Sequence, residues 1–188
     1  MLGLFCFVLQ EHNKSNPGAH SCVKLGLGLN INCPDIRTMN FICLPFTDLS
    51  STQLYEILHL RSEVFVVEQS CVYQDVDRKD TQRGVRHLMM LDKAQLLGYA
   101  RLLPPRISYD TPSIGRILIS PAARNKGLGR VLIQESMDRA RALWPTLEIT
   151  IGAQSHLSHL YQSFGFKKVS ADYLEDGISH VDMQTSLV

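Results

Sequence analysis

The stretch that decides the fold runs over residues 113–144 and reads SIGRILISPAARNKGLGRVLIQESMDRARALW. Its first part, 113–120, is a mostly apolar run with the length of a buried strand. From 128 to 144, apolar side chains recur at spacings of three and four residues, which is typical of a helix with one buried face. The stretch therefore predicts a strand, a short loop over 121–127 and a long helix.

The turn that enters this helix has the composition of an anion site. Gly127 and Gly129 lack a Cβ, so backbone N–H groups can turn inward without obstruction. The first N–H groups of a helix have no acceptor within it, and the helix dipole places positive charge at the same end. Because Arg124, Lys126 and Arg130 surround the turn, we expect it to bind a diphosphate. The alternative is a glycine-containing loop with ordinary solvated basic residues.

The residues before this stretch predict further regular structure. The expected elements are a strand over 41–46, a helix over 50–61, a further helical turn over 64–67 and hairpin strands over 87–91 and 95–103. The helix begins at a Ser-x-x-Gln capping box, formed by Ser50 and Gln53.

The residues after the stretch continue the alternation of strands and helices. We expect a strand over 148–151, a helix over 156–164 and strands over 167–173 and 181–186. No internal repeat is visible. This order predicts a single α/β (α+β) domain, in which helices flank a mixed central sheet.

Composition limits the class of protein. The chain has 188 residues, 45% of them hydrophobic and 20% charged, which suits one buried core. Lysine and arginine number 19, and aspartate and glutamate 18, so the net charge is +1. This balance gives no general reason to expect binding to nucleic acid or to a membrane surface.

Residues 1–38 differ in composition from the rest of the chain. Glycine, proline, asparagine and serine interrupt any regular pattern there, so we expect a poorly ordered extension before a domain over 39–188. The apolar run Met1–Leu9 is too short to cross a bilayer, and the first lysine is Lys14. Five cysteines without Cys-x-x-Cys spacing favour reduced thiols, and we expect a cytoplasmic location.

Several motifs together resemble one family. The strand at 113–119 followed by RNKGLG at 124–129 is similar to the acyl-CoA signature of the GNAT superfamily of N-acetyltransferases. The segments GAQSHL at 152–157 and YQSFGF at 161–166 resemble the second conserved block of that family.

One branch of the family is a narrower match. The run LRSEVFVVEQ at 60–69, with YQDVD at 73–77, resembles the ElaA-type branch. The likeness extends from about Met39 to the C-terminus. It implies a GNAT-like fold whose parallel strands, here 113–120 and 148–151, splay apart to admit the pantetheine arm of acetyl-CoA.

The resemblance also implies which residues contact acetyl-CoA, the expected co-substrate. These are Ile117, Leu118, Ile119, Arg124, Asn125, Lys126, Gly127, Leu128, Gly129, Arg130 and Gln154. The backbone of Ile117 and Ile119 would pair with the pantetheine arm, and the N–H groups of 126–130 would hold the diphosphate. Arg124 would reach phosphate, because its planar fork matches phosphate oxygens. Gln154 either bonds the pantetheine or is an ordinary polar loop residue.

The reaction implied is direct transfer of an acetyl group from the thioester to a primary amine in a ternary complex. The leaving thiolate needs a proton, and Tyr161 occupies the position of the acid in many relatives. Tyr161 also belongs to an apolar helix face, so packing alone is the competing interpretation. The N–H of Leu118 or Ile119 would polarise the thioester carbonyl.

The base that takes the proton from the amine is less defined. Glu68 and His87 are the leading candidates, Glu63 and His180 are further ones, and an ordered water is an alternative.

Three arginines, Arg61, Arg101 and Arg116, have two possible roles. They either bind a carboxylate of the acceptor or pair with Asp75, Asp77 or Glu68 to fix the fold. The spacing Asp75-x-Asp77-x-x-Asp80 lacks the glycine and distal glutamate of a calcium loop, so we expect no metal.

Two other functions compete with acetyl transfer. One is a non-catalytic acyl-CoA-binding sensor or interaction module of the same fold, because the fold alone does not establish chemistry. The other is acyl transfer resembling that of acyl-homoserine-lactone synthases, for which we find no carrier or S-adenosylmethionine motif. We expect a monomer or homodimer, with an acceptor side built by residues 61–86.

Overall fold

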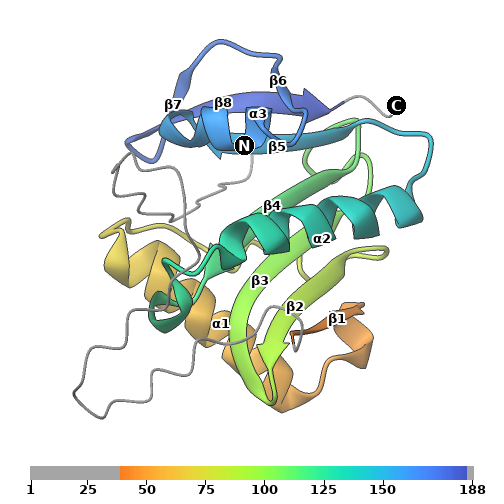
Figure 1. Cartoon of the computed structure of the whole chain (residues 1–188), viewed down its shortest axis with the longest axis vertical. Helices are drawn as coiled ribbons and strands as arrows, with labels where there is room; N and C mark the ends of the chain where they lie inside the picture. Colours follow the sequence, from red (N-terminus) through yellow and green to blue (C-terminus); the bar gives the residue numbers. More distant parts are fainter. Residues whose placement is uncertain (1–38, 186–188) are drawn as a thin grey trace, which may run out of the picture.

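The structure, a computed structural model, describes residues 39–185 and consists of one mixed sheet with helices on both faces (Figure 1). The strand order is β1-β2-β3-β4-β5-β8-β6, and β7 pairs with β8 beside this path. The strands are β1 (Asn40–Leu44), β2 (Arg86–Asp92), β3 (Gln95–Leu103), β4 (Ser113–Ile119), β5 (Ile149–Gln154), β6 (Lys167–Lys168), β7 (Tyr173–Glu175) and β8 (Ile178–Thr185). The predicted mixed sheet with flanking helices is confirmed; residues 1–38 lie outside the described residues.

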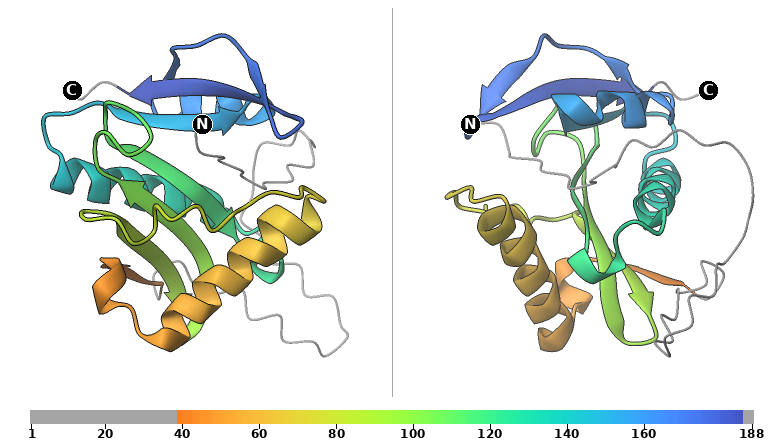
Figure 2. Two further views of the ribbon diagram at one scale, coloured as in Figure 1. Left: turned by 180° about the vertical axis from the view of Figure 1, so that it is seen from behind. Right: turned by 60° about the vertical axis from the view of Figure 1, so that its left-hand side comes forward.

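The two longer helices, α1 (Ser51–Arg61) and α2 (Leu128–Leu143), cover opposite faces of the sheet (Figure 2). A short helix, α3 (Ser158–Gln162), lies on the same face as α2 and shares its hydrophobic core. Single turns of 3-10 helix occupy 46–48, 121–123 and 155–157. Within the described residues, no helix is long and apolar enough to cross a membrane.

α1 begins where the capping box predicts. The Ser50 hydroxyl accepts a hydrogen bond from the Gln53 backbone at 3.1 Å, and the Gln53 side chain accepts one from the Ser50 backbone at 2.9 Å. The chain then continues as a π-helical segment, Ser62–Glu68, which carries Val64 and Phe65 into the core under α1. The predicted further turn over 64–67 is therefore confirmed.

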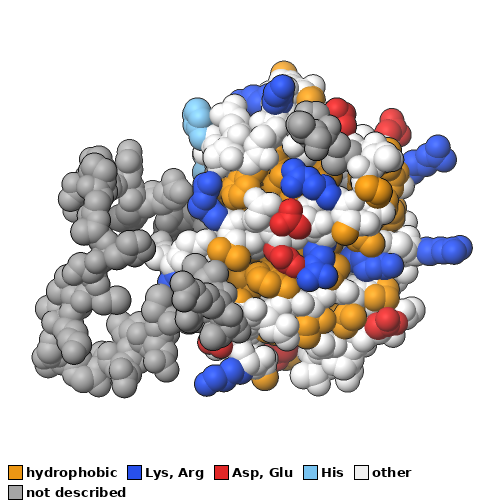
Figure 3. Space-filling model, turned by 45° about the vertical axis from the view of Figure 1, so that its right-hand side comes forward, with side chains coloured by type: hydrophobic (Ala, Val, Ile, Leu, Met, Phe, Trp, Pro, Cys, Tyr) orange, Lys and Arg blue, Asp and Glu red, His pale blue; other side chains and the backbone are white. Residues whose placement is uncertain are grey.

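α2 buries the face that its sequence predicts. Ile133, Met137 and Ala140 are buried against the sheet, and Trp144 packs beside them at the end of the helix. Opposite charges lie next to one another on the outer surface, as in the ion pair between Glu135 and Arg139. Figure 3 shows basic and acidic side chains interspersed over one face of the molecule.

β4 and β5 run parallel but stay together over only one pair of residues. Ser113 is paired with Thr150, whose N–H donates to the carbonyl of Pro112 at 2.9 Å. β4 then remains paired with β3, while β5 remains paired with β8. We call the parting of β4 and β5 beyond Ser113 and Thr150 the splay, and it confirms the fold that the family resemblance implies.

A bulge in β4 lies beside the splay. Two residues, Arg116 and Ile117, lie opposite the single residue Ala100 of β3. Arg116 has a φ of +53°, a conformation that few non-glycine residues adopt. A bulge changes the face that later side chains take: Ile117 and Ile119 pack under α2, whereas Leu118 packs against α1.

The last third of the chain differs from prediction in its boundaries. The strand expected over 167–173 is wrong, because β6 and β7 are separate pieces joined by a polar segment in which Lys168 contacts Asp172. β8 begins three residues before the expected 181, because β7 and β8 form a hairpin across Asp176 and Gly177. Both turn residues have positive φ, +48° and +81°, as tight hairpin turns require.

The helix expected over 156–164 is also shorter than predicted. A 3-10 turn precedes α3, and Gly165, with φ +88°, lies just past its end. β5 extends three residues beyond the expected 151, so Gln154 is the last residue of the strand rather than a loop residue.

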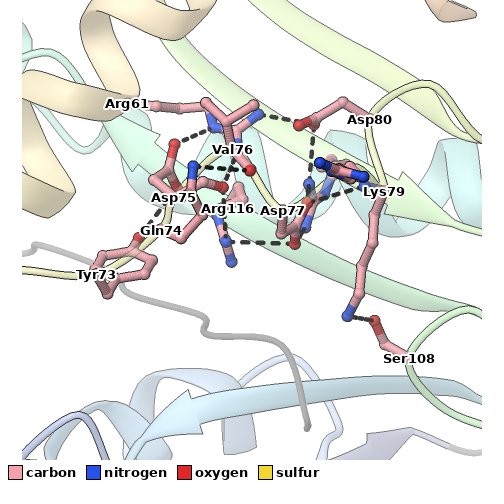
Figure 4. A network of polar contacts seen from close by, with 12 residues as sticks. Arg61, Tyr73, Gln74, Asp75, Val76, Asp77, Lys79, Asp80, Ser108 and Arg116 are labelled. Carbon is pink, nitrogen blue, oxygen red and sulfur yellow. Dashed lines mark hydrogen bonds and ion pairs between the residues drawn. The ribbon is translucent and has the colours of Figure 1, made fainter.

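A buried network of charges joins α1 to the sheet. Its anions are Asp75, Asp77 and Asp80, which belong to residues 69–85, here called the aspartate loop (Figure 4). Its ion pairs are Arg61 Nε–Asp75 at 2.9 Å, Arg61 Nη1–Asp80 at 2.7 Å, Arg101 Nη2–Asp77 at 2.8 Å, Arg101 Nη1–Asp80 at 2.9 Å, Arg116 Nε–Asp75 at 2.7 Å and Arg116 Nη2–Asp77 at 3.5 Å. The network fixes the aspartate loop across the face of the sheet on which α1 packs.

A histidine and a tyrosine complete the interior of this network. His87 Nδ1 lies 2.8 Å from the Tyr99 hydroxyl, and Nε2 lies 3.1 Å from the backbone carbonyl of Asp80. Both side chains are fully buried. Burial lowers the pKa of His87 and raises that of Tyr99, so both are held in their neutral forms.

Asp80→Asn is expected to lower the free energy of unfolding by about 3–5 kcal/mol. The amide keeps an acceptor oxygen but leaves two buried guanidinium groups without the charge that balances them. Urea denaturation measures the loss. Glu135→Gln is the matched control, because the Glu135–Arg139 pair is partly exposed and such pairs contribute at most about 1 kcal/mol. Equal losses in the two variants would contradict the structural role of the network.

Stability is expected to fall in two steps as pH is lowered. Burial lowers the pKa of His87 below its unfolded value near 6.5, so its contribution to stability declines once the pH falls below about 6.5. Burial raises the pKa of Asp80, but attraction to Arg101 and Arg61 outweighs it, and the net pKa is lowered. Hydrogen bonding and attraction to Arg101 likewise overcome burial at Asp77.

Because their pKa values lie below the unfolded value near 3.9, these two carboxyl groups stabilise the fold above that pH and lose this contribution as pH falls below it. Urea midpoints between pH 3 and 8 should therefore show a shallow decline below about 6.5 and a steeper one below about 4. His87→Gln should remove part of the shallow step; stability that stays flat down to pH 4 in the unaltered protein would refute this assignment.

Candidate functional site

The loop that enters α2, residues 120–127, builds an open cradle at the helix N-terminus. A 3-10 turn over Pro121–Ala123 leads to Asn125 and Gly127, whose φ angles are +61° and +74°. Gly127 is the N-cap of α2, and it offers the helix no side-chain hydrogen bond. A Cβ placed on Gly127 would meet nothing within 4 Å, so open space lies in front of the first turn of the helix. Main-chain N–H groups of such a turn suit an anionic group.

Arg124 does not lie free over this cradle, because it forms a two-pronged ion pair with Glu68. Its Nη1 and Nη2 lie 2.5 and 2.7 Å from the two carboxylate oxygens of Glu68, and its Nε donates to the Ile119 carbonyl at 3.2 Å. The hydrogen bond from Arg124 holds the pKa of Glu68 below its usual range. The predicted phosphate ligand and a predicted catalytic base are therefore bound to each other.

The other two basic residues of the cradle also have protein contacts. Lys126 Nζ donates to the Ala122 carbonyl at 3.3 Å. The Arg130 guanidinium stacks over the ring of Phe164, 4.8 Å from its centroid, which links the first turn of α2 to the end of α3.

The edge of β4 leads from the cradle into the splay. Ile117, Leu118 and Ile119 are buried, with side chains packed on the two faces of the sheet. The backbone edge of these residues faces the side from which β5 has diverged. Gln154 lies across the splay at the end of β5, buried and paired in register with His180 of β8.

Tyr161 lies on α3, which packs against β6 and β8 on the face of the sheet that α2 covers. It is 4% exposed and packs edge-on against Phe166, with ring centroids 5.9 Å apart. The structure therefore shows the packing role of Tyr161 that the sequence suggested. A role as the acid would require the same buried side chain to serve both purposes.

The candidate bases are dispersed rather than brought together. His87 is buried under the aspartate loop with both ring nitrogens engaged, a placement that does not suit direct proton uptake from a bound amine. Glu63 is exposed and lines a shallow groove with Tyr55 on the outer side of α1. His180 is buried on β8, with Nδ1 2.9 Å from the Ile178 carbonyl.

All three arginines pair with carboxylates of the aspartate loop, with a different third partner from the one expected. Asp80 joins Asp75 and Asp77 in their network, whereas Glu68 pairs with Arg124. Within the described residues, no three histidine, cysteine or acidic side chains are grouped in a way that could hold a metal ion.

Two features near the splay were missed from the sequence. Asp182 of β8 accepts hydrogen bonds from the hydroxyls of Tyr109 and Tyr173, each at 2.8 Å, and so ties the β3–β4 connection to the last hairpin. Glu175 of β7 is half-buried, and burial raises its pKa above the usual range. The only sequence signal for Glu175 is that it precedes the Asp-Gly turn at 176–177.

Comparison with known proteins agrees with this geometry. Residues 48–187 match the family described as Acetyltransferase (GNAT) domain. Protein ElaA from Escherichia coli (strain K12) is 39% identical over 145 residues, which cover 77% of this chain and 95% of ElaA. The crystal structure of Escherichia coli ElaA gives a TM-score of 0.74 at 38% identity, covering 79% of this chain and 99% of that chain.

Two further structures share the fold. An acyl-CoA N-acyltransferase from Pseudomonas aeruginosa gives a TM-score of 0.76 at 41% identity, covering 79% of this chain and 99% of that chain. The structure of yncA from Salmonella typhimurium with its cofactor acetyl-CoA gives a TM-score of 0.59 at 20% identity, covering 79% of this chain and 95% of that chain. At 20% identity the likeness to yncA shows a shared fold alone.

The family match extends over most of the chain, and ElaA is similar along nearly its whole length. The splay and the helix that begins at Gly127 beside it agree with this family match. The chain belongs to the GNAT family of acetyltransferases, in its ElaA-type branch.

Proposed function

We propose that this chain is an acetyl-CoA-dependent N-acetyltransferase that moves an acetyl group to a primary amine of a small molecule or a protein. One observation carries the proposal: the splay between β4 and β5 opens directly beside the N-terminus of α2, where Gly127 leaves space. A strand edge and a helix N-terminus in this arrangement suit a cofactor arm and its diphosphate.

The proposed binding mode uses main-chain groups first. The N–H groups of residues 126–130 would hold the diphosphate, and the free edge of β4 at Ile117–Ile119 would pair with the pantetheine arm. Arg124 would contribute only in exchange for part of its pairing with Glu68, and its Nε already bonds the Ile119 carbonyl. The yncA structure with acetyl-CoA supports this use of the fold.

The chemistry needs a neutral amine, stabilisation of the developing oxyanion and a proton for the leaving thiolate. In the proposal, the N–H of Leu118 or Ile119 polarises the thioester carbonyl, and the Tyr161 hydroxyl protonates the thiolate. We assign deprotonation of the amine to ordered water. His87 is enclosed by Tyr99 and Asp80, and the lowered pKa of Glu68 makes it a weak base.

A non-catalytic acyl-CoA-binding module is the second candidate. The engagement of Glu68 by Arg124 and the burial of His87 favour it, because neither side chain is free to accept a proton. Thiol release from acetyl-CoA over a panel of amines separates the two functions, since a module would bind the cofactor and turn over none of them.

Gly127→Ala is expected to weaken binding of CoA by about tenfold or more, as measured by titration calorimetry. At φ +74° an alanine costs about 1–2 kcal/mol, which favours a different backbone conformation that no longer presents the same N–H groups, and its methyl group occupies the open space at Gly127. Gly177→Ala is the matched control, because Gly177 has φ +81° and equally open surroundings but lies in the β7–β8 turn. A similar CoA affinity in both variants would remove the cofactor from this cradle.

Tyr161→Phe is expected to lower kcat by about 10²–10⁴ if the hydroxyl supplies the proton to the thiolate. The ring and its contact with Phe166 are kept, so CoA affinity and thermal stability should change little. Steady-state assays of thiol release measure kcat, with Tyr55→Phe, an exposed tyrosine of α1, as the control. An unchanged kcat would leave Tyr161 with its packing role only.

A further inference from the structure

Among the described residues, two guanidinium nitrogens of the buried network, Arg101 Nε and Arg116 Nη1, have no hydrogen-bond partner. Arg116 uses Nε and Nη2 to bond the side chain and backbone of Asp75 at 2.7 and 3.1 Å, and its Nη1 has no hydrogen-bond partner. The residue is 1% exposed. Because Nε and Nη2 share one edge of the planar group, Nη1 lies on the opposite edge. Figure 4 shows one nitrogen of Arg116 pointing away from the aspartates, on the side where the pale blue strands lie.

The place of Arg116 in the sheet distinguishes it from the other two arginines. Arg61 has a partner at every guanidinium nitrogen. Arg101, whose Nε also lacks one among the described residues, comes from β3, which lies between β2 and β4 and does not border the splay. Arg116 comes from the bulge of β4, the strand that borders the splay. A buried charged donor without a partner is costly, so a site that holds one in place suits a ligand that completes it.

The guanidinium of Arg116 is also held in a fixed direction. Besides its bonds to Asp75, it lies 5.9 Å from the ring centroid of Phe65 and 5.7 Å from that of Tyr73. A donor that is fixed before the ligand arrives loses little conformational freedom on binding.

The charge of the network favours an anion at this position. Four cationic side chains, the three arginines and Lys79, face the three carboxylates of the aspartate loop, which leaves one positive charge in excess. Lys79 Nζ is bonded to the Ser108 hydroxyl at 2.8 Å, so it contributes charge from the side of the β3–β4 connection.

Two carboxylates lie in the half of the sheet beyond β5, on β7 and β8. Glu175 of β7 is half-buried, and its carboxylate interacts electrostatically with both Arg116 and Lys79, although it belongs to the other half of the sheet. Asp182 of β8 adds a second carboxylate in that half of the sheet. Cationic side chains on the β4 side of the splay and carboxylates in the half of the sheet beyond β5 suit a ligand that carries both signs of charge.

We propose that the acceptor is an amine that also carries a carboxylate, as an amino acid does, with the carboxylate on Arg116 Nη1 and the ammonium group on Glu175. The inference rests on the proposed function and names the substrate class of its acceptor side. Arg116 and Glu175 are then specificity-determining residues, and neither takes part in the transfer of the acetyl group.

The test compares kcat/KM for acceptors matched in length, at equal concentrations of free amine. Glycine, β-alanine and 4-aminobutyrate are each compared with the corresponding amide, which keeps the carbonyl but lacks the charge. The best amino acid should exceed its own amide by about 10- to 100-fold, the range for a hydrogen bond to a charged group. Amides that serve as well as the acids would overturn the proposal and leave the acetyltransferase function intact.

A pair of arginine variants tests whether Arg116 is the residue that causes the preference for acids over amides. Arg116→Lys should reduce the acid-to-amide ratio severalfold, because the ammonium group keeps the charge but is not held at the position of Nη1. Arg61→Lys, which disturbs the same network, should keep the ratio. The ratio is insensitive to the amount of folded enzyme, because both substrates share the same preparation. If both variants keep the ratio, Arg116 does not hold the carboxylate.

Glu175→Gln should lower kcat/KM for acids and amides alike by about tenfold or more, because both carry the ammonium group. Asp176→Asn is its matched control, since Asp176 is the neighbouring exposed carboxylate and asparagine tolerates its φ of +48°. Equal activity of these two variants would remove Glu175 from the site.

The outcome also separates this inference from the proposed function. If no amine is turned over, binding of the same amino acids to the CoA-loaded protein is measured by calorimetry. Binding that Arg116→Lys weakens and Arg61→Lys spares would support the acceptor class while the catalytic proposal fails. The absence of such binding would overturn both.

Discussion

Three guanidinium groups that leave α1, β3 and β4 meet three carboxylates of one loop in the interior, where an unmatched charge costs several kcal/mol. The arrangement is stable only when it is complete, because each carboxylate serves at least two arginines. It holds the aspartate loop across the sheet and fixes the guanidinium of the β4 bulge beside the splay. A cluster of charges, rather than an apolar contact, therefore shapes the sheet face between α1 and the splay.

Local features of this fold could be predicted from the sequence. The capping box at Ser50 and the apolar face of α2 depend on residues within a few positions of one another. The hairpin at Asp176 and Gly177 was missed, and its Asp-Gly pair is itself a turn signal. The strand boundaries around it were wrong because short, exposed strands such as β6 carry little hydrophobic pattern.

In the candidate site, too, features formed by neighbouring residues could be predicted, and contacts between distant residues could not. The glycine-entered helix and the basic residues around it lie in one short segment, so their grouping could be read directly. The partners of those side chains could not, because Glu68 lies 56 positions from Arg124 and Asp80 lies 19 and 21 positions from its two arginines. A carboxylate near several arginines in sequence has many possible pairings, and only packing selects among them. For the same reason, the sequence did not predict that Tyr99 and Asp80 enclose His87.

The pairing of Arg124 with Glu68 changes how the cradle can bind an anion. A guanidinium that already holds a carboxylate on two nitrogens and a carbonyl on the third has little attraction left for a diphosphate. Lys126 and Arg130 remain nearby, but one bonds a carbonyl and the other stacks on a ring. Main-chain N–H groups at the start of α2 have no competing carboxylate among these contacts, and the helix dipole acts in the same direction. In the proposed cofactor complex, affinity therefore depends on the backbone geometry at Gly127 more than on the number of basic side chains around it.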